Sequence, residues 1–145
     1  MSAVARILHV AEPPARYAAR PPLVLDCSAL AAIVFREGWH AQAQQRVQGH
    51  TLHAPNLLQA EIASVAVEKQ RRGEQHAADG LAQAAEMELD LHRIDVQAVT
   101  ALALRYDLSA YDAAYVWLAA ELMAPLATFD EKLATAAQAH LSSLP

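Results

Sequence analysis

Short β-like runs alternate with longer helix-like stretches along most of this sequence, and this alternation leaves few architectures open. The β-like runs occupy residues 23–25, 51–54, 90–94 and 125–128, with a weaker run at 141–144. Strands that alternate with helices in this way are typical of βαβ units, in which successive strands run parallel and helices cover the sheet. The sequence therefore predicts an α/β fold with a mostly parallel central sheet of about five strands.

Turn residues mark the ends of the expected helices. Gly49 and Gly73 stand where two helices should stop, and Pro55 stands where another should begin. The expected helices cover residues 28–48 in one or two segments, 57–72, 74–88, 96–106, 109–122 and 131–139. Together with the β-like runs they make one domain across residues 23–145, and a chain of 145 residues is long enough to bury a full core.

The first 22 residues differ in composition from the rest of the chain. They hold four of the seven prolines, including the pairs in AEPPARYAARPP. Proline has no N–H to donate to a helix or a sheet. We therefore expect residues 1–22 to be a Pro-rich N-terminal extension that is poorly ordered or loosely docked on the domain.

The charge and the apolar pattern exclude several classes of protein. Sixteen acidic residues against 11 basic ones give a formal net charge of −5, which argues against a module that holds nucleic acid through bulk positive charge. No apolar stretch reaches the ~18 residues of a membrane span, and Arg6 and His9 interrupt any secretory signal. The single Cys27 cannot form an intrachain disulfide, which suits a reducing compartment. We expect a cytoplasmic protein that binds any polyanion with the help of metal ions, a basic patch or a second protein.

Two of the β-like runs end in an aspartate that a helix-like stretch follows. Asp26 follows the first run and Asp130 follows the run at 125–128. Aspartate is a common helix N-cap, so either residue alone could be an ordinary cap. The carboxyl ends of parallel strands, however, meet at one edge of a sheet, where α/β proteins usually bind ligands. A pair of acids at equivalent strand ends therefore favours a site.

Glu61 lies inside an apolar stripe. In PNLLQAEIASVAVEK it shares a helix face with Leu57, Ile62 and Val65, so its carboxylate should face the core or a cleft. Burying an unpaired charge is costly, and this placement calls for a cation. The cation could be a bound ion or the guanidinium of an arginine such as Arg105, and a glutamate at the margin of the stripe could also reach water.

Asp112 also lies in an apolar stripe, within DLSAYDAAYVWLAAEL. Ser109 and Asp112 have the spacing of a capping box, in which the acid at the third helical position reaches back to the cap N–H. A capping role and a site role both put the carboxylate at a helix N-terminus near the edge of the sheet. The two interpretations are therefore compatible.

Four acids in one pocket cannot all ionise close together unless cations are present. Mg²⁺ and Mn²⁺ are suitable, because they accept carboxylate and water oxygens. Such a cluster is used in metal-assisted phosphodiester hydrolysis, in which the ions lower the pKa of an attacking water and neutralise charge on the phosphate. The acids in question are Asp26, Glu61, Asp112 and Asp130.

The segments LVLDCSALAAIVFREG, APNLLQAEIASV, LSAYDAAYVWLAAEL and PLATFDEKLATAA resemble PIN-domain ribonucleases, specifically the VapC-like toxins of bacterial toxin–antitoxin pairs. The resemblance covers about residues 23–142. It implies that Ser28 and Thr128 support the site by orienting carboxylates or a metal-bound water. It also implies that the family's catalytic and metal-binding acids correspond to Asp26, Glu61, Asp112 and Asp130.

The same resemblance implies a PIN-like three-layer α/β/α sandwich and an endoribonuclease activity that depends on Mg²⁺ or Mn²⁺. It further implies homodimerisation, an RNA substrate and neutralisation by a cognate antitoxin. Arg36 and Lys132, which lie near the strand-end acids in the sequence, are candidates for contact with RNA phosphates. His50 and His53 should point to opposite faces of a strand, so we do not expect them to form a metal pair.

Two other functions compete with this hypothesis. An aspartate-nucleophile phosphatase also begins with a strand that ends in aspartate, but its chemistry needs a second acid two residues later, where this chain has Ser28. A non-catalytic PIN-like module that binds a partner protein would have no need of four acids, and this chain has all four.

Overall fold

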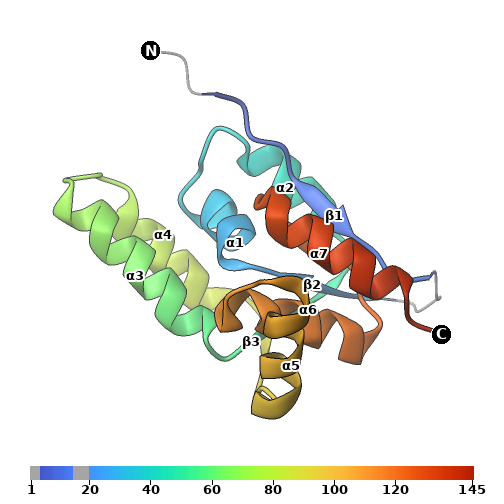
Figure 1. Ribbon diagram of the computed structural model, residues 1–145. Coiled ribbons are helices and arrows are strands. Elements are labelled where there is room, and N and C mark those ends of the chain that lie inside the picture. The colour runs from blue at the N-terminus through green and yellow to red at the C-terminus, as the bar shows by residue number, and fades with distance from the viewer. Residues whose placement is uncertain (1–3, 15–19) are drawn as a thin grey trace.

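The computed structural model describes residues 4–14 and 20–145, and within them one five-stranded sheet lies between two layers of helices (Figure 1). The strand order is β1-β5-β2-β3-β4. β2, β3, β4 and β5 run parallel, and β1 pairs antiparallel with β5. The strands are β1 (His9–Ala11), β2 (Pro22–Leu25), β3 (Thr51–Pro55), β4 (Leu89–His92) and β5 (Leu126–Thr128). The predicted α/β fold with a mostly parallel sheet is confirmed.

The helices cover both faces of the sheet. The helices are α1 (Cys27–Val34), α2 (His40–Val47), α3 (Leu58–Arg71), α4 (Ala77–Glu86), α5 (Val96–Tyr106), α6 (Ala110–Leu122) and α7 (Glu131–Ser142). α1, α3 and α4 pack together in one layer, whereas α6 and α7 pack against each other in the other layer and α5 packs on α6 (Figure 1). No helix in the described ranges has both the length and the apolar character needed to cross a bilayer.

β2 occupies the centre of the core. Leu23, Val24 and Leu25 are completely buried, as expected for a parallel strand that has helices on both faces. Burying each such side chain contributes about 1.5–3 kcal/mol. On the neighbouring strand, Leu126 and Ala127 are also buried. Two adjacent buried strands therefore fix the positions of the residues that follow their carboxyl ends.

The N-terminal segment differs from the expectation of a poorly ordered or loosely docked extension. His9–Ala11 form the edge strand β1, in which His9 pairs with Thr128 and Ala11 with Leu126. The first proline pair, Pro13 and Pro14, comes after this strand and does not interrupt its hydrogen bonds. The second proline pair leads into β2. Residues 1–3 and 15–19 lie outside the described residues.

The weak β-like run at 141–144 is not a strand. Leu141 is completely buried as part of α7, which extends to Ser142. An apolar residue on the buried face of a helix continues the helical pattern as well as it would begin a strand. The fifth strand of the sheet is β1 instead.

Candidate active site

The carboxyl ends of β2 and β5 bring two aspartates to the same edge of the sheet. β2 and β5 are neighbours in register, with Leu25 opposite Ala127. Asp26 follows β2 and is the N-cap of α1, where its Oδ1 accepts a hydrogen bond from the Ala29 N–H at 3.0 Å. Asp130 follows β5 and caps α7 in the same way through the Leu133 N–H at 3.1 Å. Both aspartates therefore cap helices and also face the ligand-binding edge of the sheet.

Asp26 is buried and held by three donors. Its side chain is among the few buried polar groups, at 6% exposure. The Ser28 hydroxyl donates to Oδ1 at 2.6 Å and the Thr128 hydroxyl donates to Oδ2 at 2.5 Å, in addition to the Ala29 N–H. Burial raises the pKa of Asp26, and these hydrogen bonds lower it in part. The carboxylate is therefore fixed in orientation but costly to ionise.

Ser28 and Thr128 also tie the two strand ends together. The Ser28 hydroxyl accepts a hydrogen bond from the Phe129 N–H at 2.9 Å. The Thr128 hydroxyl accepts one from the Asp130 N–H, also at 2.9 Å. Each hydroxyl thus donates to Asp26 and accepts from the turn between β5 and α7, so the relative positions of the two strand-end acids depend on both.

Glu61 reaches the cluster from the first turn of α3. It is half-buried, and its Oε1 accepts a hydrogen bond from the Tyr115 hydroxyl at 2.5 Å. Burial raises the pKa of Glu61, and the nearby charges of Asp26 and Asp112 raise it further, against the lowering effect of the Tyr115 hydrogen bond. The Arg105 guanidinium lies over the ring of Tyr106 at 5.1 Å and makes no ion pair with Glu61. The partner of Glu61 is therefore a neutral phenol.

Asp112 lies in the first turn of α6. The hydroxyl of the N-cap Ser109 accepts the Asp112 N–H at 3.1 Å, so the serine half of the predicted capping box forms. Burial raises the pKa of Asp112, and repulsion from Asp130 raises it further, whereas Ser109 and the charge of Lys132 lower it. Asp112 therefore lies close to both Asp130 and Lys132.

The four acids form one electrostatically connected cluster. The charges of Asp26 and Asp112 each raise the pKa of Glu61, and Asp112 also raises the pKa of Asp26. In the described part of the chain, none of the four has a lysine, arginine or histidine nitrogen within 4.0 Å. The cluster thus gathers carboxylates that no basic side chain of the described residues pairs with directly, and such a cluster favours a bound cation.

The donor set fits a hydrated hard cation. No three histidine, cysteine, aspartate or glutamate side chains of residues 4–14 and 20–145 stand close enough to ligate one ion by themselves. Mg²⁺ is usually bound through one or two carboxylates and keeps several of its waters, so it needs no complete protein cage. A zinc site is a poor fit, because zinc is usually held by cysteine and histidine side chains, whereas the four residues of the cluster are all carboxylates. The residues present therefore suit Mg²⁺ or Mn²⁺.

The two candidate RNA contacts differ in position. Lys132 lies in the first turn of α7, close enough to Asp112 to lower its pKa, and also pairs with the exposed Asp107 at 3.8 Å. Arg36 follows the carboxyl end of α1 in a left-handed conformation with φ of 50°. Asp26 caps the other end of that helix, about 12 Å away along the axis. The structure brings Lys132 to the acid cluster but not Arg36.

Two side-chain contacts in the structure were not predicted from the sequence. The Nδ1 of His53 lies 2.9 Å from the Nε2 of His92 on the adjacent strand. Tyr115, which donates a hydrogen bond to Glu61, is not among the site residues that the sequence predicts. A signal was available for Tyr115, because it follows Asp112 by three residues and so lies on the same side of α6. No sequence pattern indicates the contact between His53 and His92, because it depends on β3 and β4 being neighbours in the sheet.

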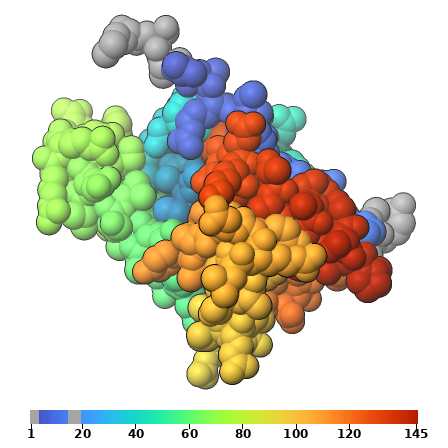
Figure 2. All heavy atoms as spheres, in the orientation of Figure 1, coloured from blue at the N-terminus to red at the C-terminus, as the bar shows by residue number. Residues whose placement is uncertain are grey.

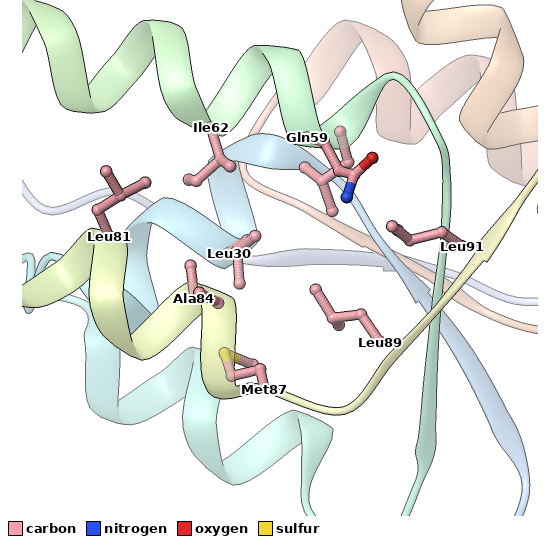
Figure 3. A pocket seen from close by; sticks show the side chains of 10 residues that line it. Leu30, Gln59, Ile62, Leu81, Ala84, Met87, Leu89 and Leu91 are labelled. Carbon is pink, nitrogen blue, oxygen red and sulfur yellow. The ribbon is translucent and has the colours of Figure 1, made fainter.

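An apolar cavity of about 380 Å³ lies apart from the acids, between α1, α3, α4 and β4 (Figure 3). Its lining is almost entirely aliphatic, with Gln59 as the one polar residue. It therefore suits apolar side chains and not a phosphate group. The lining residues are Leu30, Leu58, Gln59, Ile62, Leu81, Ala84, Ala85, Met87, Leu89 and Leu91.

Known proteins match most of this chain. A model of the PIN domain matches residues 23–139. Ribonuclease VapC9 of Mycobacterium tuberculosis is 37% identical over 121 residues, with 81% of this chain and 93% of that protein covered. Ribonuclease VapC3 of Pyrobaculum aerophilum is 36% identical over 120 residues, with 77% and 92% covered. The crystal structure of PAE2754 from Pyrobaculum aerophilum has a TM-score of 0.63 at 23% identity, covering 81% of this chain and 80% of that one, which is a likeness of fold.

Proposed function

This chain belongs to the PIN-domain family, and we propose that it is a metal-dependent endoribonuclease that acts as the toxin of a toxin–antitoxin pair. Two relatives that are 37% and 36% identical to it over 121 and 120 residues are named ribonuclease VapC9 and ribonuclease VapC3. The residues proposed to bind the ion and to be catalytic are Asp26, Glu61, Asp112 and Asp130.

The observation that carries the proposal is the cluster of four acids, none of which has a basic nitrogen within 4.0 Å among residues 4–14 and 20–145. The pKa values of Asp26, Glu61 and Asp112 are all raised, first by burial and then by one another or by Asp130. A protein that used these carboxylates only as caps or in ion pairs would leave them exposed or next to a base. Perturbed acids gathered at the carboxyl edge of a parallel sheet are instead typical of a functional site.

Two of the four acids are oriented by hydroxyl groups of neighbouring side chains. Asp26 is the buried member, oriented by Ser28 and Thr128, and Glu61 is oriented by Tyr115. A divalent ion bound here would neutralise charge on the scissile phosphate and lower the pKa of the attacking water. The N-termini of α1, α6 and α7 also point at the site, and helix N-termini favour anions such as phosphate.

The test is cleavage of RNA by the purified protein with Mg²⁺. Wild type should cut RNA, and Asp130→Asn should not, because the carboxylate is lost while an asparagine can still cap α7. Asp79→Asn, at an exposed position of α4, is the matched control and should cut at the wild-type rate. Equal cleavage by wild type and Asp130→Asn would reject the assignment, and so would activity that survives EDTA.

The cognate antitoxin is the proposed protein partner, and the apolar cavity is its proposed docking site. The cavity is bordered by Ile62, the residue next to Glu61 on α3 (Figure 3). A segment that filled it with apolar side chains would therefore pack against α3, the helix that carries Glu61. Leu81→Asp at the rim should weaken antitoxin binding in calorimetry without slowing RNA cleavage. Unchanged antitoxin affinity would move the docking site elsewhere.

A homodimer is proposed, supported by large exposed apolar side chains on α5 and at the start of α6. Val96 and Leu104 of α5 are 67% and 81% exposed, and Tyr111 in the first turn of α6 is 63% exposed. Exposed apolar side chains of this size are common at interaction sites when they lie together. Leu104→Lys should lower the molar mass measured by light scattering from that of a dimer to that of a monomer. Because the proposed substrate is cellular RNA, we place the protein in the cytoplasm.

A further inference from the structure

The N-terminal arm, defined as residues 4–12, leads to the same edge of the sheet as the acids. β1 runs antiparallel to β5, and His9 at the start of β1 pairs with Thr128 at the carboxyl end of β5. Residues 4–8 therefore continue past the sheet on the side where Asp130 lies. Figure 2 shows the arm in dark blue next to the orange-red start of α7.

The arm is anchored to the domain at its other end. The Glu12 side chain forms an ion pair with Arg46 of α2. The Glu12 N–H donates to Gln138 Oε1 of α7, and the Gln138 Nε2 donates to the Glu12 carbonyl, both at 3.1 Å. With β1 paired along β5, this end of the arm has a fixed position relative to the acid cluster.

The N-terminal arm places Arg6 over the rings of Trp39 and Phe129. Its guanidinium carbon lies 5.4 Å from the ring centroid of Trp39 and 5.7 Å from that of Phe129, which are the distances of cation–π contacts. Phe129 stands between Thr128 and Asp130 in the chain, and its own N–H is bonded to Ser28. The two rings thus hold Arg6 beside the β5–α7 turn that carries Asp130.

The charge of Arg6 is not used within the part of the chain that the structure describes. Arg6 is exposed and has no carboxylate oxygen within 4.0 Å among those residues. It also does not contribute to the pKa shifts of the acids, whereas Lys132 does. Arg6 therefore lies beside the β5–α7 turn without taking part in the charge interactions of these three acids. A guanidinium stacked on aromatic rings keeps its N–H edge free for a phosphate.

We propose that Arg6 binds a phosphodiester of the RNA next to the one that is cut. An acidic protein with a formal net charge of −5 needs local cations to hold a polyanion, and Arg6 supplies one beside the acid cluster. The match to the PIN domain begins at residue 23, so this contact would be added by a segment outside the matched region. The inference rests on the proposed endoribonuclease function.

The test measures RNA affinity at several salt concentrations with a short single-stranded RNA. To prevent cleavage, the titrations use the Asp130→Asn background, with and without Arg6→Ala, and follow fluorescence anisotropy. Arg6→Ala should weaken binding by about 3- to 10-fold and reduce the slope of log affinity against log salt by about 0.7. Arg6→Lys should keep the salt slope because it keeps the charge. Arg20→Ala, which removes an exposed arginine before β2 at the opposite edge of the sheet, should change neither quantity.

Measuring KM and kcat for RNA cleavage by the active protein distinguishes a failure of this inference from a failure of the proposed function. In the active protein, Arg6→Ala should raise KM by a similar factor and leave kcat unchanged, and its melting temperature should show that it remains folded. Wild-type affinity and salt slope in Arg6→Ala would overturn the inference while cleavage by wild type still supported the function. RNA binding that depends on Arg6 in a protein that never cleaves would reject the function and keep the contact. A protein that binds no RNA would reject both.

Discussion

Glu61 and Ile62 are neighbours on α3, but they face two regions of opposite character. Glu61 joins a cluster of acids that raise one another's pKa values, and Ile62 lines an apolar cavity whose walls belong to the core. In the first region the side chains disfavour the folded state unless a cation is present. In the second they stabilise it. Substitutions on the side of α3 that faces the acids should therefore lower RNA cleavage and leave the fold stable. Substitutions on the side that faces the cavity should lower the free energy of unfolding and leave cleavage nearly unchanged.

The largest expected effect is on cleavage in the acid cluster. Asp112→Asn should lower kcat/KM by at least about 100-fold, because a carboxylate proposed to hold the ion is lost. The fold should survive, since the Ser109 cap bonds to the backbone N–H of residue 112 and not to its side chain. Gel-based RNA cleavage measures the loss. A kcat/KM of Asp112→Asn within threefold of the wild-type value would contradict the proposed role of the acid cluster in cleavage.

The next effect is on stability at the apolar wall. Ile62→Ala should lower the free energy of unfolding by about 2–4 kcal/mol, because it removes buried methyl groups beside an existing cavity. Urea denaturation measures this change. Well below the melting temperature, the variant should keep RNA cleavage within about threefold. A variant that is fully stable but inactive would show that the two sides of α3 are not independent.

A smaller effect is expected where the two regions meet, at Tyr115. Tyr115→Phe removes the hydroxyl that holds Glu61 and should weaken Mn²⁺ binding by about 10-fold, as is usual for a partner of a metal ligand. Calorimetric titration of the metal gives this number directly, without any cleavage assay. The matched control is Tyr111→Phe, at an exposed position one turn earlier on α6. If Tyr115→Phe bound Mn²⁺ as tightly as wild type, the hydrogen bond would have no positioning role.

The smallest expected effect is the pH dependence of stability without metal. Raised pKa values mean that the folded state binds protons on Asp26, Glu61 and Asp112 more tightly than the unfolded state does. In EDTA, stability should therefore be greatest below about pH 4 on this account and should fall as pH rises through the raised values. Metal affinity has the opposite sign, and should fall as pH drops through the same values.

Asp112→Asn sharpens this last prediction. Removing one of the mutually repelling charges should raise the free energy of unfolding in EDTA at pH 7 by about 0.5–1 kcal/mol, and should flatten the pH dependence. Thermal melts in EDTA across the pH range provide both readings. A variant that is destabilised at pH 7 would indicate that the carboxylate stabilises the fold, contrary to the comparison.

The features that the sequence predicted well are those with local patterns. The ends of two β-like runs located Asp26 and Asp130, and apolar stripes located Glu61 and Asp112, because each pattern spans only a few turns or one strand. That Asp26 and Asp130 lie at one edge could be inferred from a parallel sheet, whose carboxyl ends share that edge. The approach of Glu61 and Asp112 depends on how α3 and α6 pack against the sheet. Ser28 and Thr128 could be named only from the family resemblance, but their bonds to Asp26 follow from that same edge.

The features that the sequence did not predict depend on contacts between distant segments. β1 has three residues and no alternation of apolar and polar side chains. It forms a strand because its backbone pairs with β5 at the edge of the sheet. The Tyr115–Glu61 bond joins residues 54 positions apart. Arg36 seemed close to Asp26 in the sequence, but a helix of eight residues carries it to the opposite end. Contacts of this kind depend on how distant segments pack together, and the spacing of apolar residues along the sequence does not predict them.

Calorimetric titration of the purified protein with Mn²⁺, for wild type and Glu61→Gln, tests the central claim most directly. Glutamine keeps the size of the side chain and can still accept a hydrogen bond from Tyr115, so only the charge is removed. The account predicts saturable binding to wild type and at least about 10-fold weaker binding to Glu61→Gln. Equal Mn²⁺ affinity in the two proteins, or no binding to wild type, would contradict the claim that these acids form a metal site.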